Sequence, residues 1–271
     1  MSAPPAGSPL ELSVVLPAHN EVALLGSTVT NLVTGLEARR LSYEIIVVEN
    51  GSSDGTLRLA RLLEAQLDSV RVLTRPVGDY GAALKTGLEA ARGDVVVSFD
   101  VDYYDLAFLD TARRLLDEGG AALVLASKRA PGARDRRPLA RRLLTACFSA
   151  ALRYGLGLRA SDAHGMKAVR RAELGTLLER CTMRGSLFDV ELVLRAEAAG
   201  LPVAEVPASV VERRPPRSAV WRRTAESLVG LARLAARRRR EARREQLALR
   251  RAGGGGAAAA RAAADRSRAG A

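Results

Sequence analysis

The first hundred residues alternate between short apolar runs and amphipathic stretches, and a polar loop follows each run. The apolar runs are rich in β-branched residues, which is typical of buried strands. They cover Leu12–Leu16, Tyr43–Val48, Val70–Leu73 and Val95–Phe99. Helical periodicity lies between them, in Val22–Leu36, Leu57–Leu67 and Ala82–Ala91. This order predicts an α/β fold with a doubly wound, mostly parallel central sheet.

The fourth apolar run ends on two carboxylates separated by one residue, Asp100 and Asp102. Open α/β sheets place their ligands at the carboxyl ends of the strands, where these two side chains are expected. Hard oxygen ligands suit Mg²⁺ or Mn²⁺, and such a cation would neutralise a diphosphate. The ordinary alternative is a strand-ending turn, because Asp is frequent in turns. Taken alone, this short motif favours the turn.

Two nucleotide-binding motifs are absent from the sequence. No G-x-G-x-x-G follows the first apolar run, which argues against a dinucleotide site of the dehydrogenase type. Lys85-Thr86 lacks the glycine that precedes the lysine of a P-loop, so residues 81–87 are expected to form an ordinary helix.

The net charge of +12 is concentrated near the C-terminus. Residues 237–271 contain eleven arginines and three acidic residues, which leaves +4 for the preceding chain. We expect four segments: a disordered leader (1–9), one α/β domain (10–217), a basic amphipathic helix (218–251) and a disordered low-complexity tail (252–271).

The cysteine content favours a reducing compartment. Cys147 and Cys181 are too few for a disulfide framework, so the cytoplasm is the expected location. The N-terminus lacks the charge and apolar core of a signal peptide. The longest uncharged apolar stretch, Leu143–Leu152, is far shorter than the roughly 20 residues of a spanning helix.

Four motifs carry a family resemblance when they are taken together and in order. They are Pro17-x-x-Asn20-Glu21, Val48-Glu-Asn-Gly-Ser-Ser-Asp-Gly-Thr56, Tyr80-Gly-Ala-Ala-Leu-x-x-Gly87 and Asp100-Val-Asp102. With them the chain resembles the family-2 glycosyltransferases, and among these the dolichol-phosphate (polyprenol-phosphate) mannosyltransferases, from about Leu12 to about Leu234.

The resemblance implies a GT-A fold that binds a nucleotide sugar, of the GDP-mannose or UDP-glucose type, with Mg²⁺ or Mn²⁺. The base and ribose pocket would be lined by Pro17, His19, Glu21, Val48 and Asn50. Asp100 and Asp102 would hold the metal, and with Val101 between them would contact the sugar diphosphate.

The sequence departs from the family pattern at two places on the donor side. Glu49-Asn50-Gly51 replaces the usual Asp-Asp-Gly, which would alter contacts to the base or ribose. Tyr103-Tyr104-Asp105 follows the metal motif, and Tyr104 is a poor ligand, which leaves Asp105 or water to complete the metal shell.

The second half of the chain matches the acceptor side of the family. Lys128 occupies the position of an arginine that meets phosphate, and Arg213 and Arg217 would clamp phosphate after the last strand. Asp162 would orient the acceptor or a cation, although a loop-capping role is the alternative, and His164 is as well explained by a structural imidazole.

Two helices complete the acceptor side of the resemblance. Arg184 and Asp189 would face the site from the start of one helix, where anions are favoured. In the other, expected over Leu139–Leu152, the apolar residues recur at helical spacing and Arg141-Arg142 lies off that stripe. These arginines are either a solvated face or, as the resemblance implies, neighbours of the lipid phosphate.

The helix expected from Ser218 offers a membrane contact. Trp221, Leu228 and Leu231 would enter the headgroup boundary while Arg237–Arg240 meet anionic lipid. Packing of this stripe on the catalytic domain is the alternative.

Three functions are compatible with these observations. The favoured one is an inverting transferase that moves a sugar, mannose in preference, to a polyprenyl phosphate, with the protein peripherally attached to the inner face of the cell membrane. The second is a related enzyme with a soluble or glycan acceptor, for which Asp162 or Asp189 would act as base. Nucleic-acid binding is the least favoured, since only the pI of about 10.8 and the arginine-rich tail suggest it.

Overall fold

The computed structural model describes residues 10–135, 139–210, 230–231, 234–237 and 240, and all statements about structure concern this part of the chain. The chain divides into two compact units, residues 1–220 and 221–271. The predicted boundaries at 217/218 and 251/252 lie outside the described residues. In the second unit, residues 230–231, 234–237 and 240 are helical.

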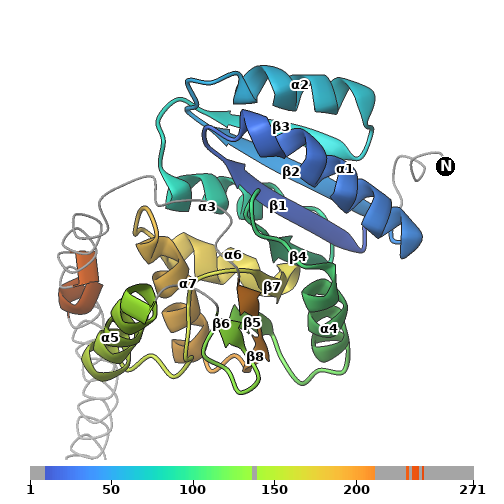
Figure 1. Cartoon of the computed structure of the whole chain (residues 1–271). Coiled ribbons are helices and arrows are strands. Elements are labelled where there is room, and N and C mark those ends of the chain that lie inside the picture. Colours follow the sequence, from blue (N-terminus) through green and yellow to red (C-terminus); the bar gives the residue numbers. More distant parts are fainter. Residues whose placement is uncertain (1–9, 136–138, 211–229, 232–233, 238–239, 241–271) are drawn as a thin grey trace, which may run out of the picture. The chain divides into compact units, whose positions relative to one another are not determined.

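The first unit contains a seven-stranded sheet in the order β3-β2-β1-β4-β7-β5-β8 (Figure 1). The strands are β1 (Leu12–Ala18), β2 (Tyr43–Asn50), β3 (Val70–Arg75), β4 (Val95–Ser98), β5 (Leu123–Ser127), β7 (Lys167–Arg170) and β8 (Val203–Pro207). β6 (Arg134–Asp135) and β9 (Ser209–Val210) form a separate parallel pair.

The sheet is mostly parallel, as the sequence predicts. β1 pairs in parallel with β2 and β4, β2 with β3, and β5 with β8. β7 is the exception, because it lies antiparallel between β4 and β5. This strand was not predicted from the sequence.

Seven helices of the described chain connect these strands. They are α1 (Val22–Ala38), α2 (Thr56–Gln66), α3 (Tyr80–Ala90), α4 (Leu106–Asp117), α5 (Leu139–Leu156), α6 (Arg171–Arg180) and α7 (Leu187–Ala198). α1 contacts α2, whereas α3 packs on β1 and β2 and contacts α6 and α7. No helix of the described chain is long and apolar enough to cross a bilayer.

The main core lies between the sheet and its helices. β1, β2 and β4 supply almost continuously buried strands, as expected for parallel strands that are covered on both faces. The chain leads from β1 outward to β3 and returns through α3 to β4 on the other side of β1. The strand order therefore reverses between β1 and β4, and such a switch point is where open α/β sheets bind ligands.

Candidate functional site

The switch point brings the ends of β1, β2 and β4 together. The loop after β1 is tied to the loop after β2, because Asn20 Oδ1 accepts a hydrogen bond from Ser53 N at 2.8 Å and Asn20 N donates to Ser52 Oγ at 3.0 Å. Asn20 has a φ of 55°, in the left-handed region that Asn tolerates better than most residues. These contacts fix the wall that carries the predicted base and ribose residues.

His19 and Asn50 lie side by side in this wall. His19 Nδ1 is 2.8 Å from the carbonyl oxygen of Asn50, and the His19 side chain is exposed. Asn50 Oδ1 accepts a hydrogen bond from Asp79 N at 3.0 Å, which joins the loop after β2 to the start of α3. Pro17 and Glu21 are partly exposed nearby in sequence, whereas Val48 is fully buried in the core. Their donor-binding roles remain predictions.

A tight turn holds the two carboxylates after β4. Asp100 N and Tyr103 N each donate to the other residue's carbonyl oxygen at 3.1 Å, so Val101 and Asp102 form the tip. Val101 is 3% exposed, and its carbonyl oxygen accepts a hydrogen bond from Thr28 Oγ1 at 2.7 Å. The turn anticipated as the alternative is therefore present, and it also presents Asp100 and Asp102 at the switch point.

Asp100 experiences an unusual electrostatic environment. Burial raises its pKa to about 6, Asp189 and Asp102 add to the rise, and Lys167 and Lys128 oppose it. Neither Asp100 nor Asp102 forms an ion pair in the described chain. The two carboxylates therefore hold negative charge that is only partly compensated.

This donor set fits a divalent cation that is shared with a substrate. Mg²⁺ is usually held by one or two carboxylates together with substrate phosphates. The described residues include no cluster of three or more His, Cys, Asp or Glu side chains suited to a metal. Asp105 instead caps α4 by accepting a hydrogen bond from Ala107 N at 2.8 Å, and Tyr104 Oη accepts one from Asn31 Nδ2 at 3.0 Å.

Lys128 and Asp162, two of the predicted acceptor residues, form an ion pair that is largely buried. Lys128 Nζ is 3.1 Å from Asp162 Oδ2, and Asp162 also accepts a hydrogen bond from His164 N at 3.0 Å. Burial by itself would raise the pKa of Asp162, but the Lys128 charge and the His164 N–H outweigh it and lower the pKa. A carboxylate stabilised in this way is a weak proton acceptor.

Lys167 and Asp189 form a second buried pair at 2.9 Å, with side chains 4% and 3% exposed. Asp189 Oδ1 has no hydrogen-bond partner of regular geometry, so this contact is an ion pair rather than an aligned hydrogen bond. Sequence reasoning assigned no role to Lys167, because its partner lies 22 positions away. In the sequence, Lys167 is marked only by its place at the end of the polar, glycine-containing segment Ser161–Lys167.

His164 lies among these groups and contacts α5. Its ring centroid is 5.6 Å from that of Phe148. Burial lowers the pKa of His164 although Asp189 and Asp162 oppose this, so the neutral imidazole is favoured at pH 7. Arg184 is 87% exposed and 3.8 Å from Asp79, at the loop before α7. Arg213 and Arg217 lie outside the described residues.

α5 is confirmed as a helix, but much of its apolar stripe is exposed. Leu139 is 75% exposed, Leu143 67% and Tyr154 86%, and Cys147 is also exposed. These residues recur on one side of the helix, while Phe148 and Leu152 on the other side face the protein. Arg142 and Arg153 flank the exposed stripe and are themselves exposed.

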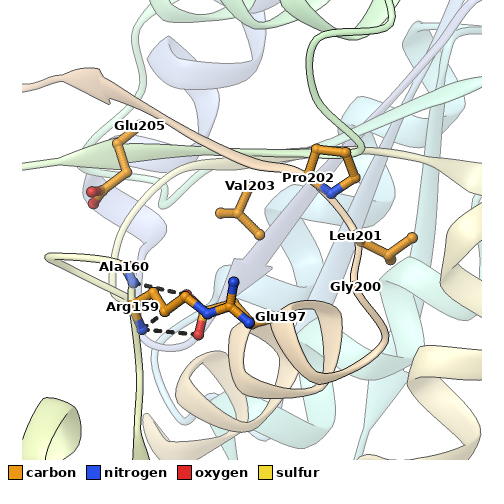
Figure 2. Close-up of a pocket in the computed structure, with 8 residues that line it drawn as sticks. All are labelled: Arg159, Ala160, Glu197, Gly200, Leu201, Pro202, Val203 and Glu205. Atoms are coloured by element: carbon orange, nitrogen blue, oxygen red, sulfur yellow. Dashed lines mark hydrogen bonds between the residues drawn. The ribbon is translucent and has the colours of Figure 1, made fainter.

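A cavity of about 360 Å³ lies elsewhere, beside the start of β8 and the end of α7 (Figure 2). Glu197 in its wall accepts hydrogen bonds from Arg159 N and Ala160 N, and Glu205 accepts one from Ser161 N. Since β8 runs parallel to β5 and β4, its start lies at the edge of the sheet opposite to Asp100. The cavity is therefore remote from Asp100, although Glu205 in its wall also accepts a hydrogen bond from Asp162 N at 3.3 Å.

Comparisons with known proteins agree with this geometry. Residues 13–175 match the family model described as Glycosyl transferase family 2. Glycosyltransferase AglD of Haloferax volcanii is 32% identical over 73% of this chain and 32% of its own length, so the chain spans about a third of that protein. An undecaprenyl-phosphate mannosyltransferase of Micrococcus luteus is 31% identical over 75% of this chain and 85% of its own.

The chain is also similar to a solved structure. Glucosyl-3-phosphoglycerate synthase of Mycobacterium tuberculosis, in complex with Mn²⁺, UDP-glucose and phosphoglyceric acid, is 26% identical, with a TM-score of 0.60. The match covers 84% of this chain and 80% of that one.

Proposed function

Because the chain belongs to glycosyl transferase family 2, we propose that it moves a hexose, mannose in preference, from a nucleotide-sugar donor to a polyprenyl phosphate. The reaction would invert the anomeric carbon. The acceptor class is supported by the undecaprenyl-phosphate mannosyltransferase that is 31% identical to this chain. The donor would be of the GDP-mannose or UDP-glucose type, and the neighbouring structure with bound UDP-glucose supports this class.

One observation carries the proposal, namely the Asp100–Asp102 pair at the switch point of the sheet. The pair lacks an ion-pair partner in the described chain, while nearby Asp162 and Asp189 each have a lysine. Unpaired carboxylates at a ligand-binding edge favour a bound cation over a purely structural role. Asp100 and Asp102 are the residues that would hold Mg²⁺ or Mn²⁺.

The proposed chemistry is a single displacement. A phosphate oxygen of the acceptor forms the new bond to the anomeric carbon, while the bond from that carbon to the nucleoside diphosphate breaks. A divalent cation would supply charge stabilisation for the departing diphosphate. His19 and Asn50 would orient the nucleoside, and Asp100 and Asp102 would fix the diphosphate end of the donor.

The acceptor phosphate needs no strong base in this reaction. A phosphate monoester has a second pKa of roughly 6, so it is already an anion near neutral pH. Cationic side chains need only place it in line with the anomeric carbon. Arg213 and Arg217 remain our candidates, whereas Lys128 would contribute less than its position in the sequence suggests, because Asp162 already neutralises it.

The exposed stripe of α5 supports a lipid acceptor. Leu139, Leu143 and Tyr154 lie on one exposed side of the helix, beside the exposed Arg142 and Arg153. An apolar face with flanking cations suits the boundary between lipid headgroups and acyl chains. We propose that this face rests on the inner surface of the cell membrane and brings the lipid phosphate to the site.

A soluble acceptor is the second candidate, and one neighbour supports it. The structure that is 26% identical to this chain contains phosphoglyceric acid, a soluble phosphorylated molecule. A hydroxyl acceptor would require a base, yet Asp162 and Asp189 are both paired with lysines. The lipid acceptor therefore remains the preferred proposal.

A donor screen tests the function directly. The full chain is incubated with Mn²⁺, a short polyprenyl phosphate and radiolabelled GDP-mannose, UDP-glucose or related donors, and label is counted in the organic phase. Label in that phase with one donor, lost when EDTA is added, supports the proposal. Label that appears only in a water-soluble product with phosphoglyceric acid or a sugar acceptor would contradict the lipid acceptor.

A further inference from the structure

One glutamate of β8 ties together two loops that carry predicted acceptor residues. Glu205 Oε1 accepts hydrogen bonds from Ser161 Oγ at 2.7 Å, from Ser161 N at 3.0 Å and from Asp162 N at 3.3 Å. Ser161 Oγ in turn lies 2.7 Å from Ser127 Oγ, at the end of β5. Glu205 therefore reaches the loop after β5 through the loop before β7.

The glutamate also sets the direction of this chain of hydrogen bonds. A hydroxyl group has one proton to donate. Because Glu205 accepts the proton of Ser161 Oγ, the contact between the two serines takes its proton from Ser127 Oγ. Ser127 Oγ also accepts hydrogen bonds from Arg129 N and Ala130 N, each at 3.1 Å. One carboxylate thus orders the backbone of both loops.

The two loops carry the ion pair of Lys128 and Asp162. Lys128 Nζ is 3.1 Å from Asp162 Oδ2 and 3.4 Å from the carbonyl oxygen of His164. An ammonium group has three N–H donors, so one remains without a partner among the residues that the structure describes. The Lys128 side chain is 14% exposed, so it is not sealed from solvent.

This ion pair follows the same edge of the sheet as the proposed metal ligands. β7 is antiparallel to both β4 and β5, and Lys167 is the register partner of Ser98 on one side and of Leu125 on the other. The chain after β5 therefore leaves the sheet at the same edge as the chain after β4, which carries Asp100 and Asp102.

Lys128 would help a phosphate at this edge only over a short range. Asp162 offsets its charge, so the remaining contribution is a hydrogen bond, which depends on the position and direction of the donor. We propose that Glu205 is a positioning residue for the acceptor phosphate, because it orders both loops and so fixes the place from which Lys128 donates. The inference rests on the proposed function, since it requires a phosphate-bearing acceptor, either a polyprenyl phosphate or a soluble phosphorylated molecule.

The experiment compares the Michaelis constants for donor and acceptor. The full chain is assayed with Mn²⁺, the donor that the wild type uses, and either a short polyprenyl phosphate or phosphoglyceric acid. A hydrogen bond to a charged group is worth about 10- to 100-fold in affinity, and Glu205→Leu should misplace this bond and raise the constant for the acceptor roughly tenfold. The constant for the donor should be unchanged. Glu205→Gln keeps one acceptor oxygen and should recover part of the loss.

Glu197→Leu is the matched control. Glu197 lies in the wall of the same cavity as Glu205, and its carboxylate accepts hydrogen bonds from Arg159 N and Ala160 N, just before Ser161. In the described chain, Glu197 forms no hydrogen bond with either serine of the two loops. This variant should lower stability but leave the acceptor constant unchanged. A Michaelis constant does not depend on the fraction of molecules folded, so the comparison holds where a variant is partly unfolded.

A double-mutant cycle asks whether Glu205 acts through Lys128. Lys128→Met should itself raise the acceptor constant, and adding Glu205→Leu should then cause a much smaller further rise than in the wild type. An undiminished effect of Glu205→Leu in the Lys128→Met background would overturn the inference.

Two further results would overturn the inference and leave the proposed function intact. One is an equal acceptor constant in the wild type and Glu205→Leu, and the other is an equal rise in Glu197→Leu. Transfer to phosphoglyceric acid alone would contradict the lipid acceptor, and the same variants then decide the inference on that acceptor. Absence of transfer by the wild type to either phosphate would overturn the proposed function and the inference together.

Discussion

Asp100 and Asp162 are two enclosed carboxylates on neighbouring parts of the sheet, and their pKa values are shifted in opposite directions. Asp100 faces other carboxylates, and burial together with Asp189 raises its pKa to about 6. Asp162 is also buried, but Lys128 and a backbone N–H hold its charge and lower its pKa. The difference separates a carboxylate whose charge the described fold stabilises from one whose charge it disfavours, and the second is the one that we propose as a metal ligand.

The same contrast extends to the segments that carry these residues. The loops after β1 and β2 bind mainly each other, and Asp100 and Asp102 after β4 form no ion pair with any residue that the structure describes. β5, β7 and α7 bring lysines and carboxylates together in buried pairs. The first group carries the proposed metal and diphosphate ligands, while the second carries charges that neutralise one another.

The largest effect is expected from Asp102→Ala, which removes one of the two proposed metal ligands. A bound metal contributes several kcal/mol of charge stabilisation, and about 1.4 kcal/mol corresponds to a tenfold rate change, so transfer should fall at least roughly a hundredfold. The melting temperature should be unchanged, because Asp102 is only partly buried and forms no ion pair in the described chain. Full turnover of this variant at saturating Mn²⁺ would show that Asp102 is not a metal ligand.

Lys167→Met should have the largest effect on stability. It leaves Asp189 buried without its cation, and breaking a buried ion pair typically costs about 3–5 kcal/mol. Chemical denaturation measures the loss, and the double variant Lys167→Met/Asp189→Asn should recover much of it because no buried charge remains unpaired. A loss of less than about 1 kcal/mol in the single variant would show that Asp189 does not depend on Lys167.

The pH dependence of the stability of Asp162→Asn tests the difference between Asp100 and Asp162 further. The folded-state pKa of Asp162 lies below its usual value of 3.8, so its charge stabilises the fold above the unfolded-state pKa. The wild type should therefore be more stable than Asp162→Asn at neutral pH. The difference should shrink as the pH falls below about 3.8 and through the lower folded-state pKa. Denaturation curves from pH 7 to pH 2 check this. A stability difference between the two proteins that grows on acidification would contradict a lowered pKa of Asp162.

Arg184→Ala should have the smallest effect on stability. Arg184 is 87% exposed and lies 3.8 Å from Asp79, a geometry in which surface ion pairs are worth roughly 0–1 kcal/mol. If Arg184 faces the site and contacts an anionic substrate, as the resemblance implies, the Michaelis constant for the donor or the acceptor should still rise. An unchanged Michaelis constant would restrict Arg184 to the surface pair.

The sequence was sufficient to predict the part of the fold that is built from local units. β1, β2 and β3 each begin at the residue expected, and the predicted GT-A fold, with its mostly parallel sheet, is confirmed by its match to solved structures. These strands are mostly apolar runs that alternate with helices, and right-handed connections between such units favour a parallel sheet. Asp100 and Asp102 could be found because they directly follow such a run.

The rest depends on contacts between distant residues. β7 was missed because Lys-Ala-Val-Arg is short and charged at both ends, and it becomes a strand only by fitting between β4 and β5. Lys167 reaches Asp189 through tertiary packing, which local spacing does not encode. The α5 helix was predicted, but the exposure of Leu139 and Leu143 depends on which neighbours cover the helix.

Thermal unfolding of Asp100→Asn and Asp162→Asn, each with and without Mn²⁺ and the bound nucleotide, tests the distinction between the two carboxylates most directly. Without metal at pH 8, Asp100→Asn should be more stable than the wild type, because it removes an enclosed charge that the fold disfavours. It should also lose the rise in melting temperature that Mn²⁺ and nucleotide give the wild type. Asp162→Asn should be less stable than the wild type and should keep that rise. A full Mn²⁺-dependent rise in Asp100→Asn, or its loss in Asp162→Asn alone, would contradict the account.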